Sequence, residues 1–264
     1  MISSHSHSGQ FCKHAVDPLE TVVLAAISQG FKVYCLTEHM PRYRTVDLYP
    51  EEAEMDLLDL HEMYAAFYSL AQTLKIKYAA EISLLIGVEI EWIYDETPNQ
   101  IAKLVKEFPM DLVVGSVHHV DGIPVDFSQE LFDSIIDPYN KYFDAQFEML
   151  QLNPHVVAHF DLVRLYGRIP QSAQILAKID RNIKYIADKN LLIEINSRGI
   201  AKQGEVYPSK WILDRMLEQG CRFTTSDDSH GAAQVGKDYL AMVDHLNSNG
   251  IHKAESVCGY IWYF

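Results

Sequence analysis

The chain opens with the stretch ISSHSH (residues 2–7), in which two histidines stand one residue apart. On an extended strand successive side chains alternate between the two faces, so His5 and His7 project from the same face. Two imidazoles on one face can provide a single metal ion with two of its ligands. A flexible polar terminus or the remnant of an expression tag would show the same pattern. The positions of the other metal-competent residues decide between these interpretations.

Apolar runs alternate with amphipathic segments along the 264 residues, a pattern typical of a fold that repeats strand and helix. After the opening strand, the expected strands are residues 32–37, 84–91, 111–117, 156–158, 191–195 and 222–225. The expected helices are residues 17–30, 50–73, 98–107, 129–150 in two stretches, 172–188, 208–218 and 233–249, before an apolar, aromatic tail at 257–264. In the first helix, Asp17 is the expected N-cap and Pro18 the first helical residue.

The length allows either two small domains or one α/β barrel, since such barrels need about 250 residues. No linker, low-complexity segment or internal repeat divides the chain. We therefore expect one barrel domain over residues 1–264.

The composition limits the class of partner. A net charge of -14 disfavours nucleic acid, because phosphate-backbone binding needs clustered Lys and Arg. A phosphorylated small molecule stays compatible, since bound divalent cations reverse the local charge. The four cysteines form no CxxC pair, which disfavours a disulfide framework and a cysteine zinc site. With no apolar run of membrane-spanning length and no signal peptide, we expect a soluble, cytoplasmic protein.

Metal-competent or polar residues stand at the carboxyl end of every expected strand. In a parallel barrel these ends meet at one rim, where such enzymes build their active sites. The residues are His5 and His7, Glu38 and His39, Glu89, His118 and His119, His159 and Asp161, Asn196, and Asp227, Asp228 and His230. Imidazole and carboxylate together favour Zn, Mn or Fe, and the set is too large for one tetrahedral ion. Two or three divalent ions with a bridging carboxylate are expected.

These motifs resemble the PHP (polymerase and histidinol phosphatase) family over essentially the whole chain. They are His5-Ser6-His7, Glu38-His39, Gly87-Val88-Glu89, Gly115-Ser116-Val117-His118, His159-Phe160-Asp161, Glu194-Ile195-Asn196 and Asp228-Ser229-His230. The resemblance is closest to the histidinol-phosphate phosphatases of that family, through TEHMPR (residues 37–42) and GSVHHVDG (residues 115–122). It implies a distorted (β/α)7 barrel whose metal site lies at the C-terminal rim of the strands.

The resemblance also implies a set of ligands for three ions. They are His5, His7, Glu89 and Asp228 for the first, Glu89, His118 and His159 for the second, and His14, His39 and His230 for the third. Glu89 would be the bridge, and Glu89, Asp228 and His230 are the residues expected to be catalytic. Because Asp227 adjoins Asp228, the aspartate ligand is ambiguous by one residue; Asp228 is preferred since the Asp-x-His spacing matches the family.

Three arginines are the expected phosphate clamp, because each follows a strand end and a guanidinium pairs with phosphate through two parallel hydrogen bonds. They are Arg42, Arg164 and Arg198. Each could also be an ordinary surface arginine. His119, Glu38 and Tyr207 complete the expected substrate contacts, although Glu38 could instead orient a metal-bound imidazole.

The resemblance implies a metal-dependent phosphomonoesterase of histidine biosynthesis that hydrolyses L-histidinol phosphate to L-histidinol and phosphate. A water activated by two ions would attack phosphorus in line. One alternative is another PHP-family phosphoesterase, a phosphodiesterase or exonuclease, which the acidic charge disfavours. The other is a non-catalytic metal-binding module, which the intact motifs disfavour. The expected partner is the small phosphomonoester, with neither nucleic acid nor membrane, and the oligomeric state is not predicted.

Overall fold

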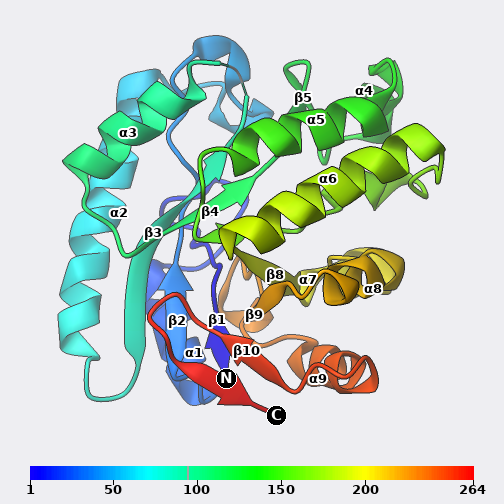
Figure 1. Ribbon diagram of the computed structural model, residues 1–264. Helices are drawn as coiled ribbons and strands as arrows, with labels where there is room; N and C mark the ends of the chain where they lie inside the picture. The colour runs from blue at the N-terminus through cyan, green and yellow to red at the C-terminus, as the bar shows by residue number, and fades with distance from the viewer. Residues whose placement is uncertain (94) are drawn as a thin grey trace.

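Seven parallel strands form the inner wall of the protein in the computed structural model, which describes residues 1–93 and 95–264 (Figure 1). In spatial order they are β1 (Ile2–Ser3), β2 (Val33–Leu36), β3 (Ser83–Glu91), β4 (Leu112–Ser116), β7 (Val156–Val157), β8 (Leu192–Asn196) and β9 (Arg222–Ser226). The segment after β1 meets β9, where Ser4 N–H donates to Thr225 O at 3.0 Å. The strands therefore make a nearly closed barrel, which confirms the fold class expected from the sequence.

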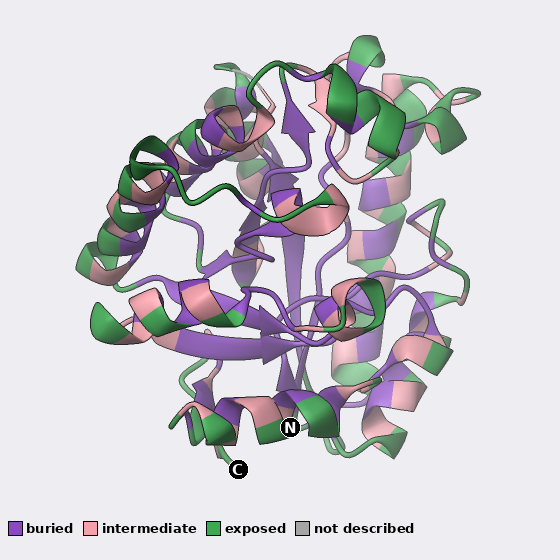
Figure 2. Cartoon of the chain, turned by 90° about the vertical axis from the view of Figure 1, so that its right-hand side faces the viewer, coloured by how far each residue is buried: buried purple, intermediate pink, exposed green. Residues whose placement is uncertain are grey.

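Helices cover the outside of this barrel, and Figure 2 shows buried strands surrounded by helices with exposed outer faces. They are α1 (Leu19–Ser28), α2 (Leu57–Lys77), α3 (Thr97–Glu107), α4 (Gln129–Ser134), α5 (Pro138–Leu150), α6 (Ala173–Lys189), α7 (Arg198–Gln203), α8 (Lys210–Glu218) and α9 (Tyr239–Ser248). In α6, Ile175, Ile179, Ile183 and Ile186 recur every three or four residues and are all buried, as an amphipathic helix requires. Among the described residues, no helix has the length and hydropathy that crossing a bilayer requires.

Shorter elements connect these layers. They are the 3-10 turns η1 (Thr45–Asp47), η2 (Pro50–Glu52), η3 (Leu162–Tyr166) and η4 (Ala232–Gln234), and the antiparallel pairs β5 (His119–Val120) with β6 (Ile123–Pro124) and β10 (Lys253–Glu255) with β11 (Ile261–Tyr263). The β5–β6 pair and α7 were not predicted. The predicted helix at 233–249 is divided into η4 and α9.

Two helix starts differ from the prediction. Asp17 is not the N-cap of α1: its Oδ2 instead accepts a hydrogen bond from Ala232 N–H at 2.8 Å, which ties the helix start to η4. The helix expected from residue 50 begins at Leu57, because Asp56 caps it and accepts the N–H groups of Leu58 and Asp59. A carboxylate at that position satisfies amide groups that lack an intrahelical partner.

The side chains of β3 show how one strand serves two layers. Val88 packs outward in the large apolar cluster beneath the helices, whereas Leu85 belongs to a smaller cluster inside the barrel. Gly87 and Glu89 follow Leu85 at two-residue spacing, so alternation places them on the same inner face. A Cβ on Gly87 would lie 2.5 Å from Leu112 O, so only glycine allows β4 to approach this closely.

The inside of the barrel is apolar toward the amino-terminal ends of its strands. This lower barrel cluster consists of Ile2, Val33, Cys35, Leu85, Leu112, Val114, Val156, Ala158, Leu192 and Ala254. Ala254 comes from the β10–β11 hairpin, and Trp262 and Phe264 pack against the same cluster. The hairpin lies beside the N-terminus in Figure 1 and closes this end, which leaves the opposite rim for the polar residues.

Candidate metal centre

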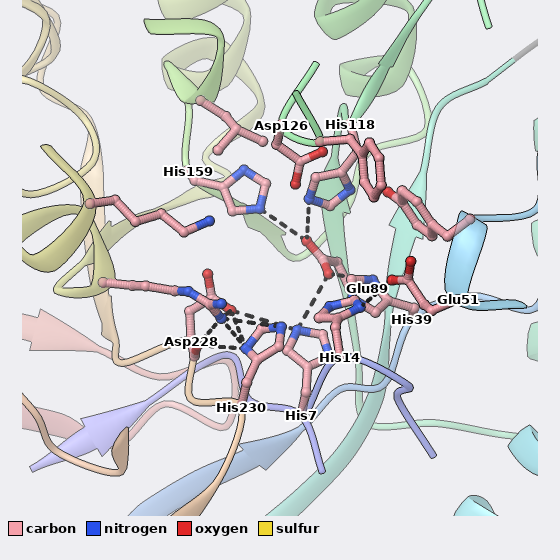
Figure 3. A pocket seen from close by; sticks show the side chains of 15 residues that line it. His7, His14, His39, Glu51, Glu89, His118, Asp126, His159, Asp228 and His230 are labelled. Carbon is pink, nitrogen blue, oxygen red and sulfur yellow. Dashed lines mark hydrogen bonds and ion pairs between the residues drawn. The ribbon is translucent and has the colours of Figure 1, made fainter. Parts of the chain in front are cut away.

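Glu89, near the carboxyl end of β3, lies at the centre of a group of imidazoles (Figure 3). Near its Oε1 are His159 Nε2 at 3.0 Å and His118 Nε2 at 3.5 Å, and near its Oε2 are His39 Nδ1 at 2.9 Å, His5 Nε2 at 3.3 Å and His7 Nε2 at 3.5 Å. The two oxygens of one carboxylate thus face different histidines. This is the arrangement that a ligand bridging two ions requires.

Asp228 and Asp227 have different surroundings although they are neighbours. Asp228 Oδ1 lies 3.6 Å from both His7 Nε2 and His230 Nδ1. Asp227 is turned behind the rim, where its Oδ1 accepts from Ser3 Oγ at 2.8 Å. The backbone of Asp228 has a φ of 44°, a left-handed conformation that costs free energy in a residue other than glycine. The structure therefore places Asp228, and not Asp227, among the histidines.

The spacing of the ligand atoms suits metal coordination. Bonds of about 2.0–2.1 Å place neighbouring ligand atoms about 3.3 Å apart around a tetrahedral ion and about 3.0 Å apart around an octahedral one. His5 Nε2 and His7 Nε2 are 3.0 Å apart, and His14 Nε2 and His39 Nε2 are 3.3 Å apart. Glu89 Oε2 is buried and makes no hydrogen bond of acceptable geometry, despite the imidazole nitrogens around it. Lone pairs that converge in this way fit a bound cation.

Four overlapping groups bring at least three such atoms within 4.8 Å of one another. They are His7, Cys12, His39 and His230; His5, His159 and Asp228; His5, His7 and Glu89; and His39, Glu89 and His118. Cys12 is the member that was not predicted as a ligand, because it belongs to no CxxC pair. The signal that was available is the two-residue spacing between Cys12 and His14.

Burial and the neighbouring charges together set the protonation of the cluster. Burial, followed by the positive field of His5, lowers the pKa of His7 to about 3. Burial and His7 likewise lower the pKa of His39 to about 3. Burial alone would raise the pKa of Glu89, but His5 and His118 outweigh it and hold that pKa well below its usual range. His7 and His39 are therefore neutral and Glu89 is ionised at neutral pH, the forms in which these groups bind metal.

Two buried carboxylates orient the histidines from behind. Glu194 Oε1 lies 3.1 Å from His5 Nδ1, and its Oε2 accepts His159 N–H at 2.8 Å. Glu38 Oε1 accepts from Ser8 Oγ at 2.6 Å, while its Oε2 lies 3.6 Å from His7 Nδ1. Burial raises the pKa of Glu38 to about 7. Glu194 belongs to one of the quoted family motifs but was given no role, although its place two residues before Asn196 on a strand puts both on the inner face.

The metal-competent residues open into a cavity of about 410 Å³. Its lining residues are His7, His14, His39, Tyr49, Glu51, Glu89, His118, Asp126, Phe127, His159, Leu162, Arg198, Lys202, Asp228 and His230. Arg198 Nη1 donates to Asp228 O at 2.8 Å and also contacts His230. Lys202 was not predicted; it lies four residues after Arg198, on the same face of α7. Arg198 and Lys202 are the arginine and lysine side chains among the described lining residues.

Arg42 and His119 lie outside this lining. Arg42 is buried, with its Nη1 2.5 Å from Glu91 Oε2 and its guanidinium over the ring of Tyr49. His119 contacts the other oxygen of Glu91 through its Nδ1. Both side chains therefore pair with Glu91, whose Oε1 lies 3.6 Å from Nδ1 of the lining residue His118. Glu91 was not predicted as a site residue.

Arg164 and Tyr207 also lie outside the cavity lining. Arg164 Nε is 3.0 Å from Asp161 Oδ2, and its Nη2 donates to Val206 O at 2.7 Å. Its guanidinium lies 4.5 Å from the centre of the buried Tyr207 ring. Of the three arginines expected to clamp phosphate, Arg198 is the one that faces the cavity.

Comparison with known proteins agrees with this geometry. The PHP domain family matches residues 3–198. The chain is 41% identical to "Probable histidinol-phosphatase" of Schizosaccharomyces pombe, covering 95% of this chain and 87% of that protein. It is 34% identical to "Histidinol-phosphatase" of Saccharomyces cerevisiae, covering 90% and 86%.

Solved structures share the fold. A histidinol phosphate phosphatase from Lactococcus lactis, crystallised with Zn, L-histidinol and phosphate, superposes with a TM-score of 0.75 at 22% identity, over 98% of this chain and 97% of that one. The fold, the family match and the identity across nearly the whole chain agree, and this protein belongs to the PHP-domain family.

Proposed function

We propose that this protein is a metal-dependent phosphomonoesterase that hydrolyses L-histidinol phosphate to L-histidinol and phosphate. The relatives named as histidinol-phosphatases support the substrate. The observation that carries the proposal is the charge distribution of the cavity. Arg198 and Lys202 approach it from α7, after β8, whereas Asp126 and Glu51 approach it from the segments that follow β4 and β2. A phosphate ester with a cationic opposite end matches this distribution.

The residues present fit two or three divalent ions of the Zn, Fe or Mn type. The proposed ligands are His5, His7, Glu89 and Asp228, then Glu89, His118 and His159, and then His14, His39 and His230. Ions held there supply an activated water and neutralise charge on the phosphoryl oxygens. Glu194 and Glu38 keep the rings of His5 and His7 in position from behind.

Arg198 binds the phosphoryl group in this proposal. Its Nη1 already contacts Asp228 O and His230, so the guanidinium is held beside the metal ligands. Charge-assisted hydrogen bonds from such a group both position phosphate and stabilise charge that develops on it. Lys202 adds a second positive charge on the same side of the cavity.

Asp126 binds the cationic end of the substrate. Its Oδ1 is buried and has no hydrogen-bond partner, although the residue lines the cavity. An ammonium or imidazolium group would satisfy that oxygen, which is otherwise costly to bury. Acidic residues at this end repel a polynucleotide, and this disfavours the phosphodiesterase alternative.

The test is a comparison of kcat/KM for histidinol phosphate, a sugar phosphate, an aryl phosphate and single-stranded DNA under one metal condition. Histidinol phosphate is expected to be clearly preferred, with negligible cleavage of DNA. Asp126→Asn should lower kcat/KM for histidinol phosphate about ten- to a hundredfold and spare the aryl phosphate, because only the first has a cationic end. Asp133→Asn, an exposed acid on α4, is the matched control. DNA or a sugar phosphate as the best substrate would contradict the proposal.

A further inference from the structure

Cys12 is buried in the loop between β1 and α1, two residues before His14. Two consecutive turns fold this loop. Cys12 N–H donates to Ser8 O at 2.8 Å, and Ala15 N–H donates to Cys12 O at 3.2 Å. The turns bring Cys12 Sγ to 3.3 Å from His14 Nε2. The loop therefore presents a sulfur atom and an imidazole nitrogen side by side.

Three further imidazoles converge on this sulfur. One ring nitrogen each of His7, His39 and His230 and the Sγ atom of Cys12 all lie within 4.8 Å of one another. His14 Nε2 is 3.3 Å from His39 Nε2, and the rings of His14 and His230 stack with centroids 4.9 Å apart. A thiol–imidazole hydrogen bond would account for the contact with His14 alone. It gives no reason for three other histidines to approach the same point.

The opposite nitrogens of these rings give a second, independent indication of a ligand. His39 Nδ1 lies 2.9 Å from Glu89 Oε2, and His14 Nδ1 lies 3.1 Å from Glu51 Oε1. Metal-bound histidines generally hold a carboxylate at the second ring nitrogen in this way. His14 Nε2 is thereby directed toward Cys12 Sγ, and the Nε2 atoms of His14 and His39 are directed toward each other. His7 already faces Glu89 and Asp228 through its Nε2, so it belongs to the neighbouring group.

We propose that Cys12 binds the third metal ion as a thiolate, together with His14, His39 and His230. This inference rests on the metal cluster of the proposed function. The sulfur bond to zinc is about 2.3 Å and the nitrogen bond about 2.0–2.1 Å, so sulfur and nitrogen ligands of one tetrahedral ion lie about 3.5 Å apart. The observed 3.3 Å is close to that value. On binding, the thiol proton leaves to solvent and a sulfur–metal bond replaces the S–H bond.

A thiolate makes this position chemically different from the two sites that share Glu89. None of its four proposed ligands is a carboxylate, so the sulfur supplies the only negative charge of the set. Thiolate is a soft ligand that selects zinc, whereas manganese prefers oxygen. The third position should therefore discriminate between zinc and manganese more strongly than the other two.

The test uses cobalt(II) loaded into the metal-free full-length protein, because a thiolate bound to cobalt gives a charge-transfer band in the near ultraviolet. Wild type and Cys258→Ser, whose thiol is exposed, should show this band. Cys12→Ser and Cys12→Ala should lack it and bind about one ion fewer per chain, with unchanged circular dichroism. In a parallel titration, Cys12→Ala should lose about tenfold or more in zinc affinity and little in manganese affinity.

Two outcomes would overturn the inference. One is a fully cobalt-loaded wild type without the band, and the other is a band that survives in both Cys12 variants. Neither measurement requires turnover. Wild type that shows the band yet leaves histidinol phosphate intact would contradict the proposed function and support the thiolate ligand.

Discussion

The two ends of the barrel interior are built from the same strands, yet one end is apolar and the other is lined by carboxylates and imidazoles. On β3, Leu85 packs in the lower barrel cluster, and Glu89, four residues later on the same face, lies among imidazoles at the rim. Their exposed fractions are 7% and 1%. Burying the leucine stabilises the fold, whereas burying a carboxylate costs free energy unless a cation or hydrogen bonds compensate. A buried side chain therefore indicates a contribution to fold stability at one end of the barrel and a functional role at the other.

Metal removal should distinguish the metal-binding rim from the lower barrel cluster more clearly than any substitution. Protein prepared without chelator is expected to contain more than one ion of the Zn, Mn or Fe type per chain. Strong chelation should abolish phosphatase activity, and added metal should restore it. The melting temperature should also fall, since each site at a hundredfold excess over its Kd contributes about 2.7 kcal/mol to stability. Active, unchelated protein with one ion or none would rule out the cluster.

Glu89→Gln should have the largest effect of any substitution at the rim. The amide keeps the shape of the side chain and removes the charge that faces five imidazoles. We expect kcat to fall about a thousandfold or more, as for other residues that act as a unit with their partners. Metal content measured on the same samples should fall too. His61→Ala, at the surface beside Glu107, should keep most of the activity; similar rates in wild type and the Glu89 variant would place the bridge elsewhere.

Leu85→Ala, in the lower barrel cluster, should lower stability and leave catalysis nearly unchanged. Removing the side chain leaves a cavity in the lower barrel cluster, which typically costs about 2–5 kcal/mol of unfolding free energy. Denaturant titration measures this loss. Metal content and kcat per folded molecule should stay close to wild type, because the cluster and the rim share no side chain. A large drop in kcat without a drop in stability would show that the two ends are coupled.

Arg198→Ala and Arg164→Ala should have different effects on kcat/KM, although both arginines were predicted from the sequence to bind phosphate. Loss of Arg198 should lower kcat/KM about ten- to a hundredfold, which corresponds to about 1.5–3 kcal/mol of lost transition-state stabilisation. Metal content should stay intact. Loss of Arg164 leaves the buried Asp161 without its ion-pair partner, so we expect a loss of unfolding free energy and a smaller change in kcat/KM. Equal losses of kcat/KM would mean that Arg164 also reaches the substrate.

The sequence by itself determined the barrel and the histidine and carboxylate residues proposed as metal ligands. Alternation of strands and helices is a local property, and strand polarity places every carboxyl end on one rim. His5, His118, His159 and Glu89 can therefore be assigned to one cluster from the sequence alone. Their convergence needed only the strand order, which the repeating pattern already implies.

Only the tertiary structure decided which residues face the cavity. Arg164 and Arg198 both follow strand ends, but side-chain directions in turns depend on partners far away in the chain. Asp161 and Val206 O hold Arg164 outside the cavity lining, whereas Asp228 O holds Arg198 inside it. The same reason applies to Glu194 behind His5, to Cys12 beside His14 and to Lys202 on α7. Periodicity gives the face of a regular element, and packing alone sets the direction of a side chain where that regularity ends.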